Sequence, residues 1–185
     1  AHARQDLLPL PRLLEATERP GDHQKGDSEM AELIRHTDIP KDCTIVATSD
    51  QHFGSKAFHR EAFIHMVDRI KKDPKCYWVH GGDEIEGQPT KHKNYDTRTL
   101  DPKYLTIEAQ CDGFCELIEP IADKCLSYQP GNHSIYLLPD FDIIRWMCER
   151  LNMPQGGYQT IIDLGHVRIF SYHGRRSMPR GAKDP

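Results

Sequence analysis

Short apolar runs recur along the chain and end at turn-forming residues. Residues 44–48 (TIVAT) end at Ser49-Asp50, residues 76–80 (CYWVH) run into Gly81-Gly82, and residues 126–129 end at Pro130-Gly131. Runs of this length, rich in β-branched and aromatic residues, are typical of buried parallel strands. Two further runs, residues 158–164 and 167–172, flank Gly165-His166 and predict a β-hairpin.

Apolar positions with helical spacing lie between these runs. The predicted helices cover residues 56–72, a segment from about Pro102 that Pro120 breaks or kinks, and a segment from an Asp140 cap to Leu151. Within the first of them, Phe63, Val67 and Ile70 share one stripe. Strands separated by helices indicate βαβ units, so the pattern predicts an α/β fold.

The N-terminal part differs in character from the rest. Residues 1–29 hold six acidic and four basic residues, several prolines, and little apolar material after Leu14. Such a segment cannot bury enough apolar surface to offset the entropy lost on ordering. We therefore expect residues 1–38 to be poorly ordered and residues 39–185 to form the domain. Met30 is a candidate natural start, in which case the preceding residues are upstream of the natural protein or foreign to it.

The composition of the chain argues against several classes of protein. The chain has 185 residues, a net charge of −4 and a mean hydropathy of −0.68. It holds no run of about 18 apolar residues and no secretory signal, so we predict no membrane segment and a cytoplasmic location. The six cysteines form no CxxC pair, which argues against a zinc ribbon or a thioredoxin-like motif. We expect them to be small buried hydrophobes in a reduced protein.

Metal-capable side chains follow four of the predicted strands. In chain order they are Asp50 and His52, then Asp83, then Asn132 and His133, then His173. In open α/β sheets, sites form at the carboxyl ends of strands, so these side chains can converge. Carboxylate, imidazole and amide groups together suit Mn, Fe or Zn, and a carboxylate can bridge two ions about 3.5–4 Å apart.

The order of these motifs resembles the calcineurin-like metallophosphoesterase family over residues 44–174. The matching pieces are Asp50-Gln51-His52, Gly82-Asp83, Gly131-Asn132-His133 and His173-Gly174. The resemblance implies a β-sandwich flanked by helices, with the second sheet incomplete. It also implies that Asp50 and His52 hold a first metal, that Asp83 bridges both metals, and that Asn132 and His173 hold the second.

Two catalytic roles follow from the same resemblance. His133 is implied to contact the phosphate and to protonate the leaving oxygen or stabilise charge there. Glu86, three residues after Asp83, matches the acid that orients this histidine. The implied cofactors are two divalent ions, with Mn²⁺ as the first choice and Fe or Zn as alternatives, and the implied nucleophile is a hydroxide that bridges them.

Three departures from the family pattern affect this interpretation. No GHxH motif follows His173 before the chain ends twelve residues later, so each ion lacks one expected ligand and the domain is expected to be truncated. Ser134 stands where the family has an acid. Gly87 and Pro130 occupy positions where protein phosphatases have phosphate-clamping arginines, which argues against a protein phosphatase.

Two functions therefore remain open. The first is a hydrolase of phosphomonoesters or phosphodiesters, with nucleotides or nucleic acids among the candidate substrates. The second is a non-catalytic, truncated relative that binds metal weakly or binds partner proteins. Basic residues beside the site are candidates to steer phosphate or are part of a solvated surface: Lys91, His92, Lys93, Arg98, Arg175, Arg176 and Arg180. His80 is interpreted as a core histidine or a support for the site. The pattern predicts no substrate-binding residue and no oligomeric state.

Overall fold

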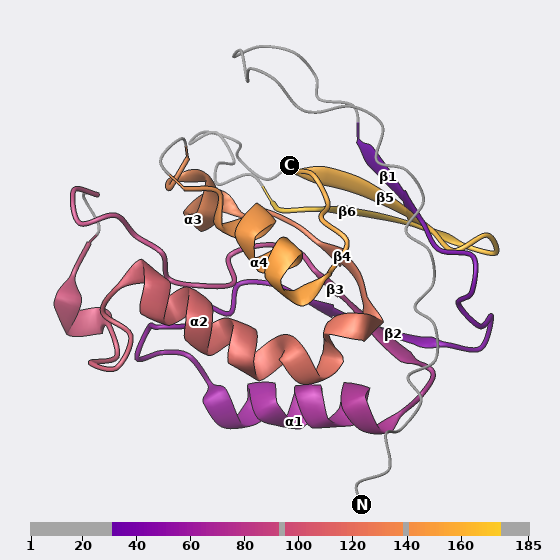
Figure 1. The fold of residues 1–185 in the computed structure, drawn as a ribbon, viewed down its shortest axis with the longest axis horizontal. Helices are drawn as coiled ribbons and strands as arrows, with labels where there is room; N and C mark the ends of the chain where they lie inside the picture. The colour runs from indigo at the N-terminus through magenta and orange to yellow at the C-terminus, as the bar shows by residue number, and fades with distance from the viewer. Residues whose placement is uncertain (1–30, 93–94, 139–140, 175–185) are drawn as a thin grey trace, which may run out of the picture.

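The structure, a computed structural model, describes residues 31–92, 95–138 and 141–174 (Figure 1). This part of the chain has a mixed α/β fold with two three-stranded sheets and four α-helices. No helix within it is long and apolar enough to cross a membrane. The predictions made for residues 1–30, for Lys93 and for the three arginines after His173 concern positions outside the described residues, where Asp140 also lies.

The first sheet consists of three parallel strands in the order β2-β3-β4. They are β2 (Thr44–Thr48), β3 (Cys76–His80) and β4 (Cys125–Tyr128). The predicted bounds of the first two are confirmed, and the third begins and ends one residue earlier than predicted. Thr48 lies opposite His80, which lies opposite Tyr128, so all three strands end at one edge of the sheet.

Helices α1 (Arg60–Lys72) and α2 (Ile107–Ile118) cover one face of this sheet. The buried stripe of α1 is the predicted one, but the helix begins at Arg60 because His59 Nδ1 accepts a hydrogen bond from the backbone of Ala62 and so caps it. Similarly, α2 begins at Ile107 rather than near Pro102 because the Thr106 hydroxyl caps it. A 3₁₀ segment, Glu119–Lys124, follows at the predicted break.

Two shorter helices follow β4. Helix α3 (Asn132–Ile135) directly follows the end of that strand and was not predicted. Helix α4 (Ile143–Leu151) has Asp142 as its N-cap rather than the predicted Asp140, because the Asp142 carboxylate accepts a hydrogen bond from Arg145 N. This helix packs against α2. The larger core cluster joins the first sheet to these helices, with Trp78, Phe114 and Met147 buried in it.

The second sheet has the order β1-β5-β6. Strands β5 (Gln159–Asp163) and β6 (Arg168–Tyr172) form the predicted antiparallel hairpin. Strand β1 (Glu32–Arg35) pairs in parallel with β5, so the prediction that residues 1–38 are poorly ordered is wrong for this strand. Its order comes from backbone hydrogen bonds to a strand more than a hundred residues away, which local composition does not reveal.

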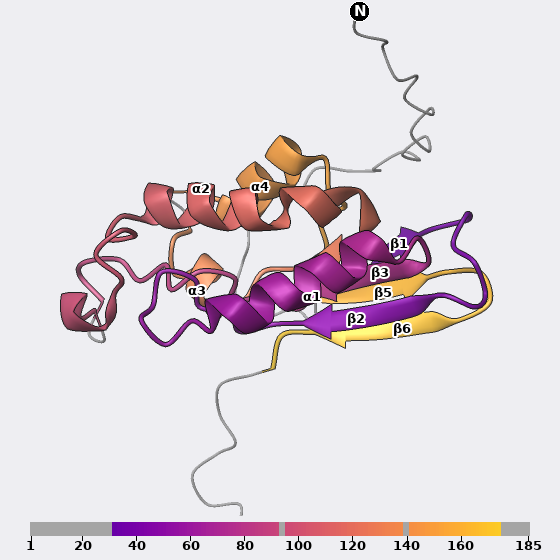
Figure 2. The ribbon, with the colours of Figure 1, turned by 90° about the horizontal axis from the view of Figure 1, so that it is seen from below.

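The two sheets contact each other through a small apolar cluster. Val79 and Leu126 of the first sheet pack against Ile162 and Leu164 of the second. Figure 2 shows helices α1 and α2 on one side of the first sheet and strands β5 and β6 on the other. This layering brings the end of β6 to the same edge at which β2, β3 and β4 end.

The cysteines are mostly buried, as predicted. All six are free, and five are buried, while Cys43 is only partly buried. Burial raises the pKa of the Cys115 thiol to about 11 and raises the pKa of Cys111 as well. These thiols therefore stay protonated at neutral pH and act as small apolar side chains, as expected.

Candidate metal centre

The seven predicted site residues lie together at the shared edge of the strands. Two groups of three each place one potential ligand atom per residue within 4.8 Å of the others. The groups are Asp50, Asp83 and His173, and His52, Glu86 and His133. The remaining residue, Asn132, places its side-chain oxygen 3.0 Å from His173 Nε2. The grouping differs from the implied one, because Asp50 falls with His173 rather than with His52.

Asp83 is the centre of the cluster. Its carboxylate is almost fully buried, and Oδ1 accepts a hydrogen bond of 2.9 Å from the backbone N–H of His133. Oδ2 faces the Nε2 atoms of three imidazoles, at 3.4 Å for His173, 3.9 Å for His52 and 4.0 Å for His133. One oxygen is thus anchored to the backbone, while the other points at nitrogen atoms from three different segments.

The histidine rings have orientations that suit metal binding. Nδ1 of His173 lies 2.8 Å from the carbonyl oxygen of Gly81, and Nδ1 of His133 contacts the carbonyl oxygen of Glu86. Because a carbonyl only accepts, Nδ1 carries the proton in each neutral ring and Nε2 keeps its lone pair. Those lone pairs face Asp83 Oδ2, which is also an acceptor. Such a convergence of acceptors is favourable once a cation lies among them.

Three of the site residues have strained backbones. Asp50, His52 and Asp83 have φ angles of 56°, 47° and 57°, and Asn152, a helix C-cap, is the fourth non-glycine residue of the described chain with positive φ. Hydrogen bonds between the two loops hold this conformation, from Asp50 N to Gly82 O (2.9 Å) and from His52 N to Asp83 O (3.0 Å). Strain of this kind costs about 1–3 kcal/mol per residue and concentrates at functional sites.

Glycines allow the loops to approach closely. A Cβ atom on Gly131 would lie 2.1 Å from Asp83 Oδ1, and one on Gly82 would lie 2.6 Å from the Cα of Gly131. Gly82 also has a φ of 103°, which other residues rarely adopt. The glycines next to Asp83 and Asn132 are therefore required by space and, at Gly82, by backbone conformation.

The predicted role of the Glu86 carboxylate is not the one that the structure shows. The carbonyl of Glu86, rather than its carboxylate, accepts the hydrogen bond from His133. Carboxylate atom Oε2 instead lies 3.3 Å from His52 Nδ1, and Oε1 accepts a hydrogen bond from Gln88 Nε2. The Glu86 carboxylate raises the pKa of His52, although burial of the ring acts in the opposite direction.

The interpretation of His80 as a core histidine is confirmed, and its hydrogen bonds reach two loops that carry candidate ligands. His80 is fully buried, stacks on Tyr128 with ring centroids 4.5 Å apart, and accepts a hydrogen bond from Gly82 N at Nδ1. Its Nε2 lies 2.6 Å from the side-chain oxygen of Gln51, which stands between Asp50 and His52. Burial lowers the pKa of His80 to about 3, so the ring is neutral and can make both bonds.

Two buried polar residues were missed from the sequence. Gln129 directly follows β4 and donates to the carbonyls of Gly157 and Ser171, while the Ser171 hydroxyl donates back to it. These bonds tie β6, and with it His173, to the first sheet. The only sequence signal is a polar residue at the end of an apolar strand. The second is Glu84, whose two carboxylate oxygens have no hydrogen-bond partner among the described residues and whose pKa burial raises to about 8.

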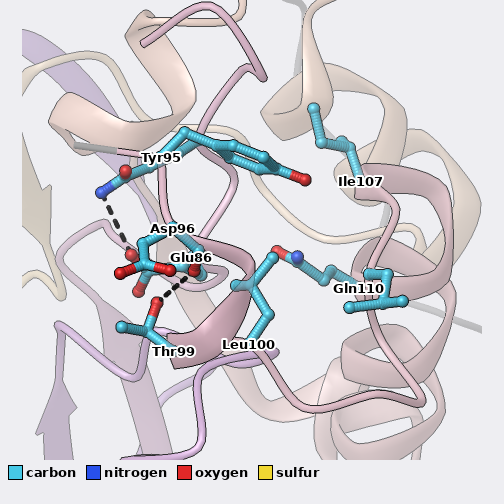
Figure 3. A pocket seen from close by; sticks show the side chains of 9 residues that line it. Glu86, Tyr95, Asp96, Thr99, Leu100, Ile107 and Gln110 are labelled. Atoms are coloured by element: carbon cyan, nitrogen blue, oxygen red, sulfur yellow. Dashed lines mark hydrogen bonds between the residues drawn. The ribbon is translucent and has the colours of Figure 1, made fainter. Parts of the chain in front are cut away.

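The site is open on one side. Asp50 is exposed, and the His52 side chain keeps 31% of its accessible surface. A small cavity adjoins the cluster through Glu86, with Tyr95, Leu100 and Gln110 among its lining residues (Figure 3). It has room for about one water molecule, so the side near Asp50 is the more accessible face of the cluster.

One of the basic residues near the site is already paired. Arg98 forms an exposed ion pair with Asp96 through its Nη2 atom at 2.8 Å. This favours the interpretation of Arg98 as part of a solvated loop. His92 stacks on Tyr136 of the segment after α3, with ring centroids 4.8 Å apart.

Comparisons of the chain with known proteins give no match to any family model, curated protein or solved structure.

Proposed function

We propose that this chain is a metal-dependent hydrolase of phosphomonoesters or phosphodiesters. The observation that carries the proposal is the convergence of three imidazole Nε2 atoms on Asp83 Oδ2, at 3.4 to 4.0 Å, with Nδ1 of two rings held by backbone carbonyls. Mixed carboxylate, imidazole and amide ligands suit Mn, Fe or Zn. Mn²⁺ is our first choice for the assay.

The residues fit a dinuclear centre. Asp83, Asp50, Asn132 and His173 would hold one ion, and Asp83 and His52 would hold the other. Divalent ions bound there would lower the pKa of a coordinated water and offset the charge of a phosphate. The chain itself fixes the rings through their Nδ1 atoms and leaves the side near Asp50 open to solvent.

Phosphate esters are favoured over other substrates by two observations. The motif order resembles that of calcineurin-like metallophosphoesterases, and two sheets in face contact with helices on the first are compatible with the sandwich of that family. The site also lies at an open edge of the fold rather than in an apolar pocket, which suits a charged and hydrated substrate.

The test is turnover of bis-p-nitrophenyl phosphate and p-nitrophenyl phosphate with and without Mn²⁺. We expect Mn²⁺-dependent turnover that EDTA abolishes and that Asp83→Asn lowers at least about 100-fold, because metal ions supply several kcal/mol of transition-state stabilisation. Asp68→Asn, an exposed aspartate of α1, is the matched control and should retain activity. Turnover by the wild-type protein no higher than that of the EDTA-treated sample would contradict the proposal.

A non-catalytic metal-binding module is the second candidate. It is favoured by the size of the cavity beside the cluster, which holds about one water molecule and no substrate group. Stoichiometric metal binding without turnover on either ester would select it.

A further inference from the structure

We infer that Glu86 is a positioning residue for His52, holding its ring so that Nε2 faces the metal centre. This inference rests on the proposed function, since it concerns the ligands of the same centre. It replaces the role implied by the motif order, in which the carboxylate of Glu86 acts on His133 and so on proton transfer.

The geometry separates the two roles of Glu86. Its carboxylate Oε2 lies 3.3 Å from His52 Nδ1, whereas the backbone carbonyl of the same residue accepts the hydrogen bond from His133 Nδ1. A variant that removes only the carboxylate charge therefore leaves the contact to His133 in place. The same variant removes the carboxylate charge beside His52, whose Nε2 lies 3.9 Å from Asp83 Oδ2.

The arrangement around His52 is similar to that of the other two rings, although Nδ1 of His52 has an ion-pair contact with a carboxylate rather than a hydrogen bond of good geometry. His173 and His133 each have a carbonyl oxygen at Nδ1 and direct Nε2 toward Asp83. For His52 the oxygen at Nδ1 is the carboxylate of Glu86. Metal-binding histidines commonly donate the second ring N–H to a carboxylate, which fixes the tautomer and strengthens the ligand.

The Glu86 carboxylate is itself held in place. Gln88 Nε2 donates to Oε1 at 3.1 Å, which leaves Oε2 for His52. The next residue, Gly87, donates its backbone N–H to the buried side chain of Gln110 on α2 at 2.9 Å. Figure 3 shows Glu86 and Gln110 at the same small cavity. A chain of contacts thus fixes this loop on a rigid helix, as a positioning role requires.

The experiment is calorimetric titration of the metal-free full chain with Mn²⁺, for wild type, Glu86→Gln and the control Glu84→Gln. Glu84 lies two residues away and outside both ligand groups, so its variant should bind as wild type does. We expect Glu86→Gln to bind the same number of ions with about 10- to 100-fold weaker affinity, the usual effect of losing such a partner.

Each contrary outcome has its own meaning. Unchanged affinity in Glu86→Gln would overturn the inference, and a loss of one ion would overturn it by showing that Glu86 is itself a ligand. In both cases the proposed function would stand. A wild-type protein that binds no metal would contradict both the inference about Glu86 and the proposed function.

A second measurement on the wild-type protein covers the case in which Glu86→Gln fails to fold. Long-range ¹H–¹⁵N spectra of the Zn²⁺-loaded protein report the tautomer of each histidine. The inference predicts that His52 is protonated at Nδ1, and protonation at Nε2 would overturn it.

Discussion

At the scale of single residues, the site depends on contacts that leave almost no free space. Asp50, His52 and Asp83 adopt the left-handed conformation, and Asp83 lies against the backbone of Gly131. Backbone hydrogen bonds between neighbouring loops stabilise this strained conformation. Small changes of volume in these loops should therefore affect the proposed metal centre before they affect the fold.

Gly131→Ala provides a direct test of this close approach. The new Cβ would lie 2.1 Å from Asp83 Oδ1, so the carboxylate must move. We expect turnover to fall about 100-fold, because a displacement of about 1 Å at a reacting centre has that effect. Gly174→Ala is the matched control, since no atom of the described residues lies within 4 Å of its Cβ although it adjoins His173. Equal activity of the two variants would show that the approach is not tight.

His80 gives the stability of the metal-free protein a defined pH dependence. Its pKa is about 3 in the fold, against 6.5 for the ordinary group, so the unfolded chain takes up the proton first as the pH falls. The contribution of a neutral His80 is therefore complete above pH 6.5 and is lost progressively toward pH 3. Between pH 6.5 and 5.0, wild type should lose about 2 kcal/mol more than His80→Gln. Urea unfolding at the two values measures this, and parallel losses would contradict it.

Glu84 is a buried carboxyl group without a partner among the described residues. An apolar side chain of similar length removes the cost of burying it, so Glu84→Met should raise the free energy of unfolding by about 1–3 kcal/mol at pH 7.5. Thermal or urea unfolding of the metal-free protein gives the value. A decrease in stability would mean that Glu84 has a stabilising partner.

At the scale of secondary-structure elements, Gln129 ties the two sheets together next to the site. It bonds Gly157 and Ser171, and through β6 it sets the position of His173. Gln129→Leu keeps the volume and leaves the partners unsatisfied, so we expect a loss of about 1–3 kcal/mol in stability. Metal affinity should weaken as well, since His173 is no longer fixed. Gln155→Leu, an exposed neighbour, should change neither quantity, and a similar result for both variants would contradict the coupling.

The elements that the sequence predicted best are those set by local pattern. Strands β2 and β3 match because apolar β-branched runs end at turn residues, and the stripe of α1 follows from helical spacing. Strand β1 was missed because its order comes from pairing with β5, far along the chain. The starts of α1 and α2 were misplaced because single capping side chains, His59 and Thr106, set them.

The members of the site were predictable, but their partners were not. Asp50, Asp83 and Asn132 follow parallel strands that end at one edge, so their convergence follows from topology. His173 follows an antiparallel strand of the second sheet and reaches them through the packing of the two sheets. Which atoms meet depends on backbone strain and side-chain rotamers. The contact between Glu86 and His52 and the pairing of Asp50 with His173 are therefore visible only in the structure.

At the scale of the whole molecule, the fold brings the ends of four strands to one edge. The sheets pack through Val79, Leu126 and Ile162, and this contact places β6 beside the first sheet. Residues separated by more than a hundred positions, such as Asp50 and His173, come within ligand distance as a result. Metal binding should therefore couple the two sheets.

The most direct test of the central claim is the metal content of the purified full chain after loading with Mn²⁺ and gel filtration, measured by mass spectrometry. The account predicts about two ions per chain for wild type and less than one for Asp83→Asn, because Asp83 faces both ligand groups. A wild-type protein that retains less than one ion per chain would contradict the account.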